Sequence, residues 1–125
     1  MRSELALKGR RVLVVEDEMM IAMLAEDMLG DLGCVVVGPA YGLKGALAMV
    51  GETNDIDVAL LDINLAGQPA FPVADALRAK GVPMIFTTGY GDAGLRDVDR
   101  GTPVLLKPYR VGELAQVLGE ALAAV

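Results

Sequence analysis

Four short apolar runs of this sequence each end on polar side chains. The residues that follow these runs are Glu16-Asp17, Asp62, Thr87-Thr88 and Lys107. If the runs form neighbouring parallel strands, their carboxyl ends lie along the same edge of one sheet, where ligands bind in open α/β sheets. We therefore expect these carboxylates, hydroxyls and the ammonium group to meet in a single crevice.

The apolar runs also indicate the fold class. Five runs are rich in valine, isoleucine and leucine and are continuously apolar, which is typical of parallel strands covered on both faces. They lie at residues 11–15, 34–37, 58–61, 83–87 and 103–106. Segments with helical periodicity separate them, so the sequence predicts an α/β protein with a doubly wound five-stranded parallel sheet and helices on both faces.

Apolar residues at steps of three and four predict which helix faces pack on the sheet. The expected faces are Ile21, Leu24, Met28 and Leu32; Leu43, Ala46, Leu47 and Val50; Val73 and Leu77; and Val111, Leu114, Leu118, Leu122 and Val125. Most of the seven methionines fall at such positions. This placement favours a role in filling the core over a thioether metal site.

The segment from Gly89 to Gly101 differs from the other connections. It contains four glycines, and its only apolar anchors are Leu95 and Val98. Glycine is unfavourable inside helices. We therefore expect a fourth helix that is short or irregular and weakly held, in the mobile part of the domain.

Length and composition limit the classes of protein to which this chain can belong. A chain of 125 residues is expected to form one domain, residues 1–125, with a core from about residue 10 and residues 1–9 as an N-terminal extension. The net charge of −6 argues against a nucleic-acid partner, because phosphate backbones bind basic surfaces. The absence of histidine excludes imidazole catalysis and the commonest zinc sites.

The sequence also predicts a location. No apolar run approaches the ~18 residues that a membrane span requires, and the first ten residues lack the apolar segment of a signal peptide. A single cysteine, Cys34, excludes an internal disulfide and is in keeping with a reducing compartment. We therefore expect a cytoplasmic protein without membrane contacts.

The acidic residues indicate a cation site. Glu16, Asp17 and Glu18 follow the first run, and Asp62 ends the third. Oxygen ligands gathered at one point suit a hard cation, above all Mg²⁺. The alternative is that Asp17 caps the following helix and that the acids complement the helix dipole. Asp62 favours the cation, because a carboxylate that ends an apolar strand is costly to bury without a countercharge.

Asp62 is the candidate nucleophile. A carboxylate can attack phosphorus to give an aspartyl phosphate, a reaction that needs in-line positioning and countercharge more than acid–base groups. Mg²⁺ would bridge the carboxylates and one phosphoryl oxygen, Lys107 would pair with a second, and the Thr88 hydroxyl would donate to a third. The Lys107-Pro108 bond can be cis, which would aim the lysine side chain over the sheet edge.

With these residues in this order, the chain resembles the receiver domains of two-component response regulators from about Arg10 to its C-terminus. The matching landmarks are the acidic pair Glu16-Asp17, the acceptor segment Leu61-Asp62-Ile63-Asn64-Leu65, the hydroxyl residue Thr88, and Lys107-Pro108. The resemblance implies the flavodoxin-like (βα)5 fold of receivers, with strand order 2-1-3-4-5.

The resemblance also implies roles for individual residues. Asp62 is the implied phosphoacceptor, and it would ligate Mg²⁺ together with Asp17 and the main-chain carbonyl of Asn64. Glu16 would act largely through water. The implied phosphodonor is a histidine kinase, which agrees with the lack of histidine in this chain.

Two further segments are similar to one subgroup of receivers. Phe86-Thr87-Thr88-Gly89-Tyr90 and Lys107-Pro108-Tyr109 resemble receivers marked by Phe-Ala-Thr-Gly-Tyr, which are often stand-alone proteins; Thr87 replaces the alanine. Val104 stands where typical receivers carry an aromatic switch residue. We expect Thr88, Tyr90 and Tyr109 to form the switch, with Tyr90 taking the place of the missing ring.

The sequence thus predicts a single-domain receiver without enzymatic activity beyond its own autophosphorylation and autodephosphorylation. It would signal through a protein partner or a histidine phosphotransfer protein, or act as a phosphate sink. A haloacid-dehalogenase-like phosphatase is one alternative, but it requires Asp-x-Asp where this chain has Asn64 at the second position. A flavodoxin-like FMN module would need a hydroxyl-rich loop in place of Glu16-Asp17-Glu18. The third alternative is a receiver fold that binds partners without phosphorylation.

Overall fold

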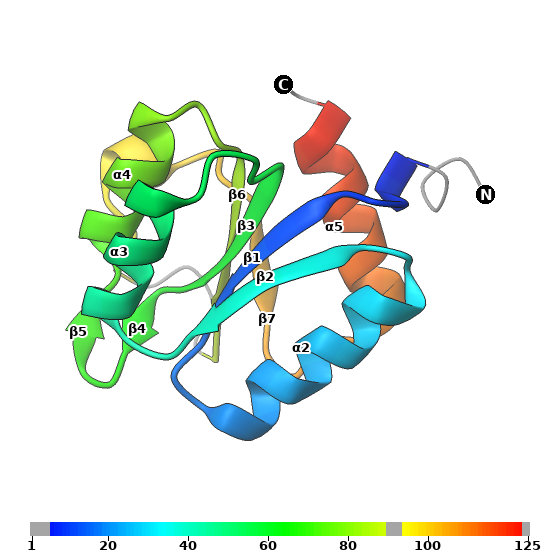
Figure 1. The fold of residues 1–125 in the computed structure, drawn as a ribbon. Coiled ribbons are helices and arrows are strands. Elements are labelled where there is room, and N and C mark those ends of the chain that lie inside the picture. Colours follow the sequence, from blue (N-terminus) through cyan, green and yellow to red (C-terminus); the bar gives the residue numbers. More distant parts are fainter. Residues whose placement is uncertain (1–5, 90–93, 124–125) are drawn as a thin grey trace.

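A five-stranded parallel sheet forms the centre of the molecule in a computed structural model, which describes residues 6–89 and 94–123 (Figure 1). Its strands are β1 (Arg11–Val15), β2 (Val35–Ala40), β3 (Val58–Asp62), β6 (Met84–Thr88) and β7 (Val104–Leu106). Their order across the sheet is β2-β1-β3-β6-β7, with every neighbouring pair parallel. Counted along the chain, this is the predicted order 2-1-3-4-5, so the fold class is confirmed.

Helices cover both faces of the sheet. They are α2 (Met19–Asp31), α3 (Leu43–Glu52), α4 (Phe71–Ala79) and α5 (Val111–Ala123). Figure 1 shows α3 and α4 on one face and α2 and α5 on the other. No helix within residues 6–89 and 94–123 has both the length and the apolar character needed to cross a bilayer.

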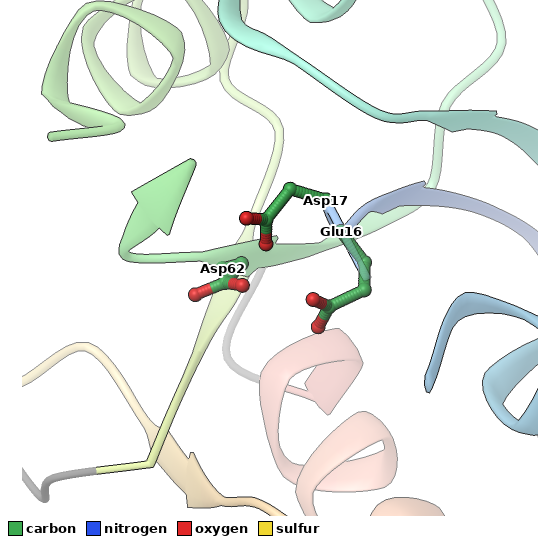
Figure 2. A group of neighbouring side chains, drawn as sticks. All are labelled: Glu16, Asp17 and Asp62. Atoms are coloured by element: carbon green, nitrogen blue, oxygen red, sulfur yellow. The ribbon is translucent and has the colours of Figure 1, made fainter. Parts of the chain in front are cut away.

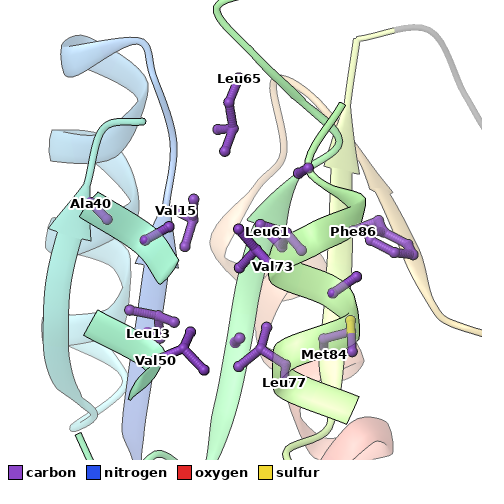
Figure 3. Close-up of a cluster of buried hydrophobic side chains, with 14 of the residues drawn as sticks. Leu13, Val15, Ala40, Val50, Leu61, Leu65, Val73, Leu77, Met84 and Phe86 are labelled. Atoms are coloured by element: carbon purple, nitrogen blue, oxygen red, sulfur yellow. The ribbon is translucent and has the colours of Figure 1, made fainter. Parts of the chain in front are cut away.

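The alternation of side chains along β1 explains why its sequence is continuously apolar. Leu13 and Val15 pack into the cluster under α3 and α4 (Figure 3), whereas Val12 and Val14 pack into the cluster under α2 and α5. Successive side chains of a strand point to opposite faces, so a strand covered on both faces needs apolar residues at every position. The second cluster also contains Leu7, which is fully buried, so the core begins before the expected residue 10.

The predicted contact face of α2 is only partly right. Met28 and Leu32 pack against the core as expected. The fully buried residues, however, are Ala22, Ala25 and Leu29, none of which was in the expected set. Leu24 is 54% exposed. The helix is apolar around most of its circumference, so periodicity could not select a face, and the small alanines allow the helix to approach the sheet closely.

Core filling is therefore also the wrong interpretation for three methionines. Met19, Met20 and Met23 lie on the outer side of α2 with exposed fractions of 62%, 78% and 54%. Met84 in β6, by contrast, is buried in the α3/α4 cluster. The other predicted faces are mostly confirmed, because Ala46, Val50, Val73, Leu77, Leu114 and Leu118 are all buried. Leu47 and Val111 are the exceptions, with exposed fractions of 37% and 41%.

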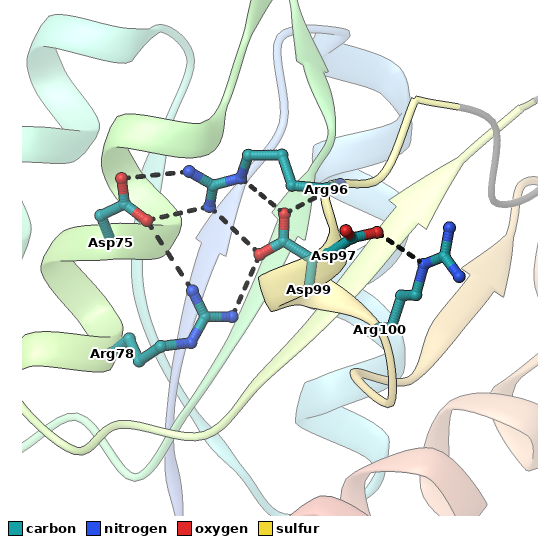
Figure 4. A network of polar contacts seen from close by, with 6 residues as sticks. All are labelled: Asp75, Arg78, Arg96, Asp97, Asp99 and Arg100. Carbon is teal, nitrogen blue, oxygen red and sulfur yellow. Dashed lines mark hydrogen bonds and ion pairs between the residues drawn. The ribbon is translucent and has the colours of Figure 1, made fainter.

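The connection between β6 and β7 contains no α-helix within its described residues, 89 and 94–103. A single 3₁₀ turn, η1 (Asp97–Asp99), takes its place, which confirms the irregular fourth helix. Val98 is not an anchor, since it is 57% exposed. Leu95 does pack against the core as expected, and the segment is also held by the fully buried Asp99, which pairs with two arginines (Figure 4). We also expected this region to be mobile. That prediction concerns in part residues 90–93, which lie outside the described residues.

A two-stranded antiparallel hairpin follows β3 and was not expected. It consists of β4 (Asn64–Leu65) and β5 (Gln68–Pro69). Ala66 and Gly67 form its turn, with φ values of 51° and 87°. Positive φ at both central residues is the conformation of tight two-residue hairpins, and the buried Leu65 anchors the hairpin to the core.

Candidate functional site

The carboxyl ends of the strands bring the predicted polar residues together. Glu16 follows β1 and Asp62 ends β3, and the register of these two strands carries both residues to the same level of the sheet. Figure 2 shows the carboxylates of Glu16, Asp17 and Asp62 around a common space. One carboxylate oxygen from each lies within 4.8 Å of the others. The predicted convergence of the acids is therefore confirmed.

Backbone N–H groups hold each of these carboxylates. Asp62 Oδ1 accepts a hydrogen bond from the Asn64 N–H at 3.2 Å, and Asp17 Oδ2 accepts one from the Ala66 N–H at 2.9 Å. The Glu18 N–H donates to Glu16 Oε2 at 3.1 Å. The Ala66 donor could not be predicted from the sequence, because a backbone N–H has no side-chain signature. The Ala-Gly turn was the only signal that could have indicated it.

Lys107 supplies the countercharge. Its Nζ lies 2.9 Å from Asp62 Oδ2 and 3.3 Å from Glu16 Oε1. The Lys107 N–H donates to the Thr88 carbonyl at 2.8 Å, which ties the end of β7 to the end of β6, and the Lys107-Pro108 peptide is cis. Burial alone would lower the pKa of Lys107, but the hydrogen bond to Asp62 and the charges of both acids raise it. The side chain is therefore an ammonium.

The three acids differ in their electrostatic environments. Burial, and then the hydrogen bond and charge of Asp62, raise the pKa of Glu16 to about 7. Burial also raises the pKa of Asp62, against the hydrogen bond from Lys107. Burial alone would also raise the pKa of Asp17, but hydrogen bonds lower it. The largest of these contributions comes from the Ala66 N–H. Three carboxylates thus face one ammonium, and the excess negative charge suits a divalent cation.

The helix-capping alternative for Asp17 is wrong. The N-cap of α2 is Glu18, and no side chain makes a capping hydrogen bond there. Asp17 instead bonds to the hairpin turn across the site. The donor set of three acidic side chains fits a hard cation, because all of its ligand atoms are oxygens and two of the three residues are buried.

A cavity of about 370 Å³ opens beside these residues. Its walls are Asp17, Glu18, Asp62, Asn64, Ala66, Gly67, Thr88, Gly89 and Lys107. Glu16 is not among them; it is buried and pairs with Lys107. Every other residue that we expected at the metal or phosphoryl group therefore borders one space, including Thr88.

Two of the three predicted switch residues, Thr88 and Tyr109, lie among the described residues. Tyr109 is buried in the α2/α5 cluster, and burial followed by the charge of Glu16 raises its pKa to about 12. Val104 packs against the α3/α4 cluster on the opposite face of the sheet. Tyr90 lies outside the described residues. Its proposed switching role stays a prediction, as does that of Thr88 and Tyr109.

Comparison with known sequences identifies relatives of this chain. Residues 12–118 match the family model of the response regulator receiver domain. The phyllosphere-induced regulator PhyR of Methylorubrum extorquens is 34% identical over 115 residues, which cover 89% of this chain and 43% of PhyR. The transcriptional regulatory protein PdtaR of Mycobacterium tuberculosis is 27% identical over 118 residues, covering 91% of this chain and 57% of PdtaR. The chain spans about half the length of these curated relatives.

Solved structures of similar length are also similar to this chain. The solution structure of SdrG from Sphingomonas melonis is 41% identical and superposes with a TM-score of 0.81, covering 92% of this chain and 97% of SdrG. The receiver domain of PhyR from Erythrobacter litoralis is 31% identical with a TM-score of 0.80, covering 94% of this chain and 93% of that domain. Sheet order, the acidic cluster and these matches agree, and the chain belongs to the response regulator receiver domain family.

Proposed function

We propose that this chain accepts a phosphoryl group on Asp62, in a Mg²⁺-dependent reaction with a histidine kinase as donor. The observation that carries the proposal is the environment of Asp62. This carboxylate ends a central strand, is 3% exposed, lies 2.9 Å from the Lys107 ammonium and faces two further carboxylates. This group has a countercharge beside it and borders an open cavity.

In the proposed reaction an Asp62 carboxylate oxygen attacks the phosphorus of the donor. The new O–P bond forms as the P–N bond of the phosphohistidine breaks, and the bonding pair stays on the imidazole nitrogen, which takes a proton from solvent. The product is an aspartyl phosphate and a neutral histidine. Because positioning and charge stabilisation dominate such reactions, no general base is required on this chain.

Lys107 and Thr88 would stabilise the transferred group. The Lys107 ammonium already lies at the acceptor carboxylate and can pair with a phosphoryl oxygen as charge develops there. Thr88 borders the same cavity at the end of β6, where its hydroxyl can donate to another phosphoryl oxygen. These roles follow the family resemblance, residue by residue.

Asp17, Asp62 and the main-chain carbonyl of Asn64 would hold the Mg²⁺, with Glu16 acting through water. The acidic side chains lie close enough to share one cation, and their oxygen ligands are the kind that Mg²⁺ prefers. When bound, Mg²⁺ neutralises negative charge on the phosphoryl oxygens and on the acids. The chain's own contribution is to hold the carboxylates in place through the Asn64 and Ala66 N–H groups.

We further propose that the phosphorylated chain signals to a protein partner in the cytoplasm. The names of the relatives support this output: PhyR of Bartonella quintana is described as an anti-anti-sigma factor, and PdtaR as a transcriptional regulatory protein. Phosphorylation adds about −1.5 to −2 charges at the sheet edge. A change of this size acts directly on the β6–β7 connection, which begins beside Thr88.

Acetyl phosphate and beryllofluoride test this proposal. With Mg²⁺ present, intact-mass spectrometry is expected to show one phosphoryl group on the wild type and none on Asp62→Asn. Asp27→Asn, which alters an exposed carboxylate of α2, is the matched control and should react normally. Beryllofluoride is a suitable phosphoryl mimic, because a solved structure of SdrG is its BeF3-activated conformation.

Backbone NMR of the beryllofluoride-treated protein distinguishes the outputs. Chemical-shift changes that spread from Asp62 to Gly94–Gly101 and Tyr109 are expected for a signalling switch. Chemical-shift changes confined to residues around the cavity would instead indicate a phosphate-sink role and contradict signalling. If Asp62 is not modified under any of these conditions, the proposed reaction is wrong.

A further inference from the structure

Glu18 occupies an unusual position for a residue at a helix start. It is the N-cap of α2, yet its carboxylate makes no capping hydrogen bond. An N-cap side chain normally accepts a backbone N–H of the first turn. The Glu18 carboxylate instead borders the phosphorylation cavity, and its Oε1 lies 3.8 Å from Lys107 Nζ.

The exposure of Glu18 separates it from the other acids of the site. The Glu18 side chain is 62% exposed, whereas the side chains of Glu16 and Asp62 are each 5% exposed. Glu18 also takes no part in the group of three acids whose oxygens lie close enough to share a cation. It is therefore a negative charge at the mouth of the cavity, in the path of any group that approaches Asp62.

The Glu18 carboxylate can act electrostatically on a ligand that is still approaching the cavity through solvent. Charges at the rim of a site change association rates and their salt dependence more than they change the bound state. Glu18 repels an approaching phosphate-bearing anion, and the repulsion grows with the negative charge of that anion. Glu18 also competes for Lys107, the only cation that contacts Asp62 among the described residues.

We propose that Glu18 selects phosphodonors by charge, an inference that rests on the function proposed above. It slows phosphoryl transfer from small, freely diffusing dianions such as acyl phosphates, and it acts less on donors that carry less negative charge at the phosphoryl group. A phosphohistidine on a protein is also slowed less, for a different reason: contacts elsewhere on that protein offset the repulsion at the rim. Glu18 is thus a specificity residue for the donor.

Two small donors test this inference without a kinase. Acetyl phosphate is a dianion at neutral pH, whereas phosphoramidate carries less negative charge and contains the P–N bond of a phosphohistidine. At low ionic strength, Glu18→Gln is expected to react with acetyl phosphate roughly fivefold faster than the wild type. Its rate with phosphoramidate should rise by less than about twofold. Rates are followed by intact-mass spectrometry with saturating Mg²⁺.

The matched control is Glu52→Gln. Glu52 is an exposed residue at the end of α3, and its substitution removes the same unit of net charge without touching the cavity. This variant should react like the wild type with both donors. In about 1 M salt the Debye length falls to roughly 3 Å, so the advantage of Glu18→Gln with acetyl phosphate should shrink to less than about twofold.

The outcomes separate the inference from the proposed function. If the wild type reacts and Glu18→Gln matches it with acetyl phosphate at low salt, charge selection by Glu18 is wrong and phosphoryl acceptance stands. If Glu18→Gln is faster with both donors to the same extent, or stays faster at high salt, the effect is local geometry and the inference is again wrong. If the wild type reacts with neither donor, phosphoryl acceptance itself fails.

Discussion

Two clusters of charged residues in this molecule have opposite compositions. At the carboxyl edge of the sheet, Lys107 pairs with Glu16, Glu18 and Asp62, and Asp17 adds a fourth acid. Between α4 and the 3₁₀ turn, two aspartates pair with two arginines, Asp75 and Asp99 with Arg78 and Arg96 (Figure 4). The first group keeps an excess of negative charge, whereas the charges of the second group balance.

The balanced network is built around Asp99, which is 0% exposed. Arg96 donates to both of its oxygens, from Nε at 2.8 Å and from Nη2 at 3.1 Å, and Arg78 Nη2 donates to Oδ1 at 3.1 Å. Arg96 also reaches Asp75 of α4 at 2.9 Å and lies over the Phe71 ring, 4.4 Å from its centroid. The network thereby joins the 3₁₀ turn to the first two turns of α4.

The pKa shifts of the two groups show what the difference in composition means. Hydrogen bonds from Arg96 lower the pKa of Asp99, so folding favours its charged form. Burial raises the pKa of Glu16 to about 7, so folding disfavours its charged form. A balanced network therefore adds to stability, while an unbalanced cluster lowers stability until a cation binds. The balanced network therefore has a structural role, whereas the acidic cluster is suited to binding a cation.

The largest expected effect is the loss of the balanced network. Asp99→Asn should lower the free energy of unfolding by about 2–3 kcal/mol, because two arginines lose charge-assisted hydrogen bonds to a buried carboxylate. Urea denaturation measures the change. Asp97→Asn is the control, since the Asp97–Arg100 pair is 94% and 77% exposed and such pairs contribute less than about 1 kcal/mol. Equal losses of unfolding free energy in the two variants would show that Asp99 has no special structural role.

A smaller effect is expected at the unbalanced cluster when a cation is added. Mg²⁺ at ten times its dissociation constant should raise the free energy of unfolding by about 1.4 kcal/mol, or the melting temperature by about 5 °C. Asp17→Asn should reduce this increase, and Asp27→Asn should leave it unchanged. A similar increase in Asp17→Asn would mean that Mg²⁺ stabilises the protein from somewhere else.

The smallest expected effect is the acid sensitivity of the network. The pKa of Asp99 is lowered in the folded state, so its stabilisation is complete above the unfolded pKa of about 3.9 and is lost as the pH falls toward the folded value. The difference in unfolding free energy between the wild type and Asp99→Asn should therefore shrink from pH 7 to pH 3.5, by at most about 0.7 kcal/mol, a limit set by the unfolded pKa. Urea denaturation at both pH values measures it. A constant difference would show that Asp99 is not stabilised as a carboxylate.

The sheet and the acidic site were predictable because their signals are local. Continuous apolar runs mark strands covered on both faces, and the residues at their ends follow from the register of a parallel sheet. Glu16, Asp62 and Lys107 therefore meet as expected. The irregular β6–β7 connection was predictable from its glycines.

Other features depended on contacts that residue order does not reveal. Periodicity could not choose the face of α2, since apolar residues lie on both sides of it and the sheet accepts the small side chains of Ala22 and Ala25. The hydrogen bond from the Ala66 N–H to Asp17 joins residues 49 positions apart. The pairing of Asp99 with Arg78 spans 21 positions.

The order of apolar and polar residues was enough to specify the fold class, the strand ends and the acids of the site, because backbone geometry converts a local pattern directly into a place in the sheet. Packing was needed to bury Asp99, to expose the methionines of α2 and to turn the Glu18 carboxylate toward the cavity. These outcomes depend on which surfaces meet across the chain. A charged or apolar side chain has the same local signature whether a distant partner covers it or solvent does.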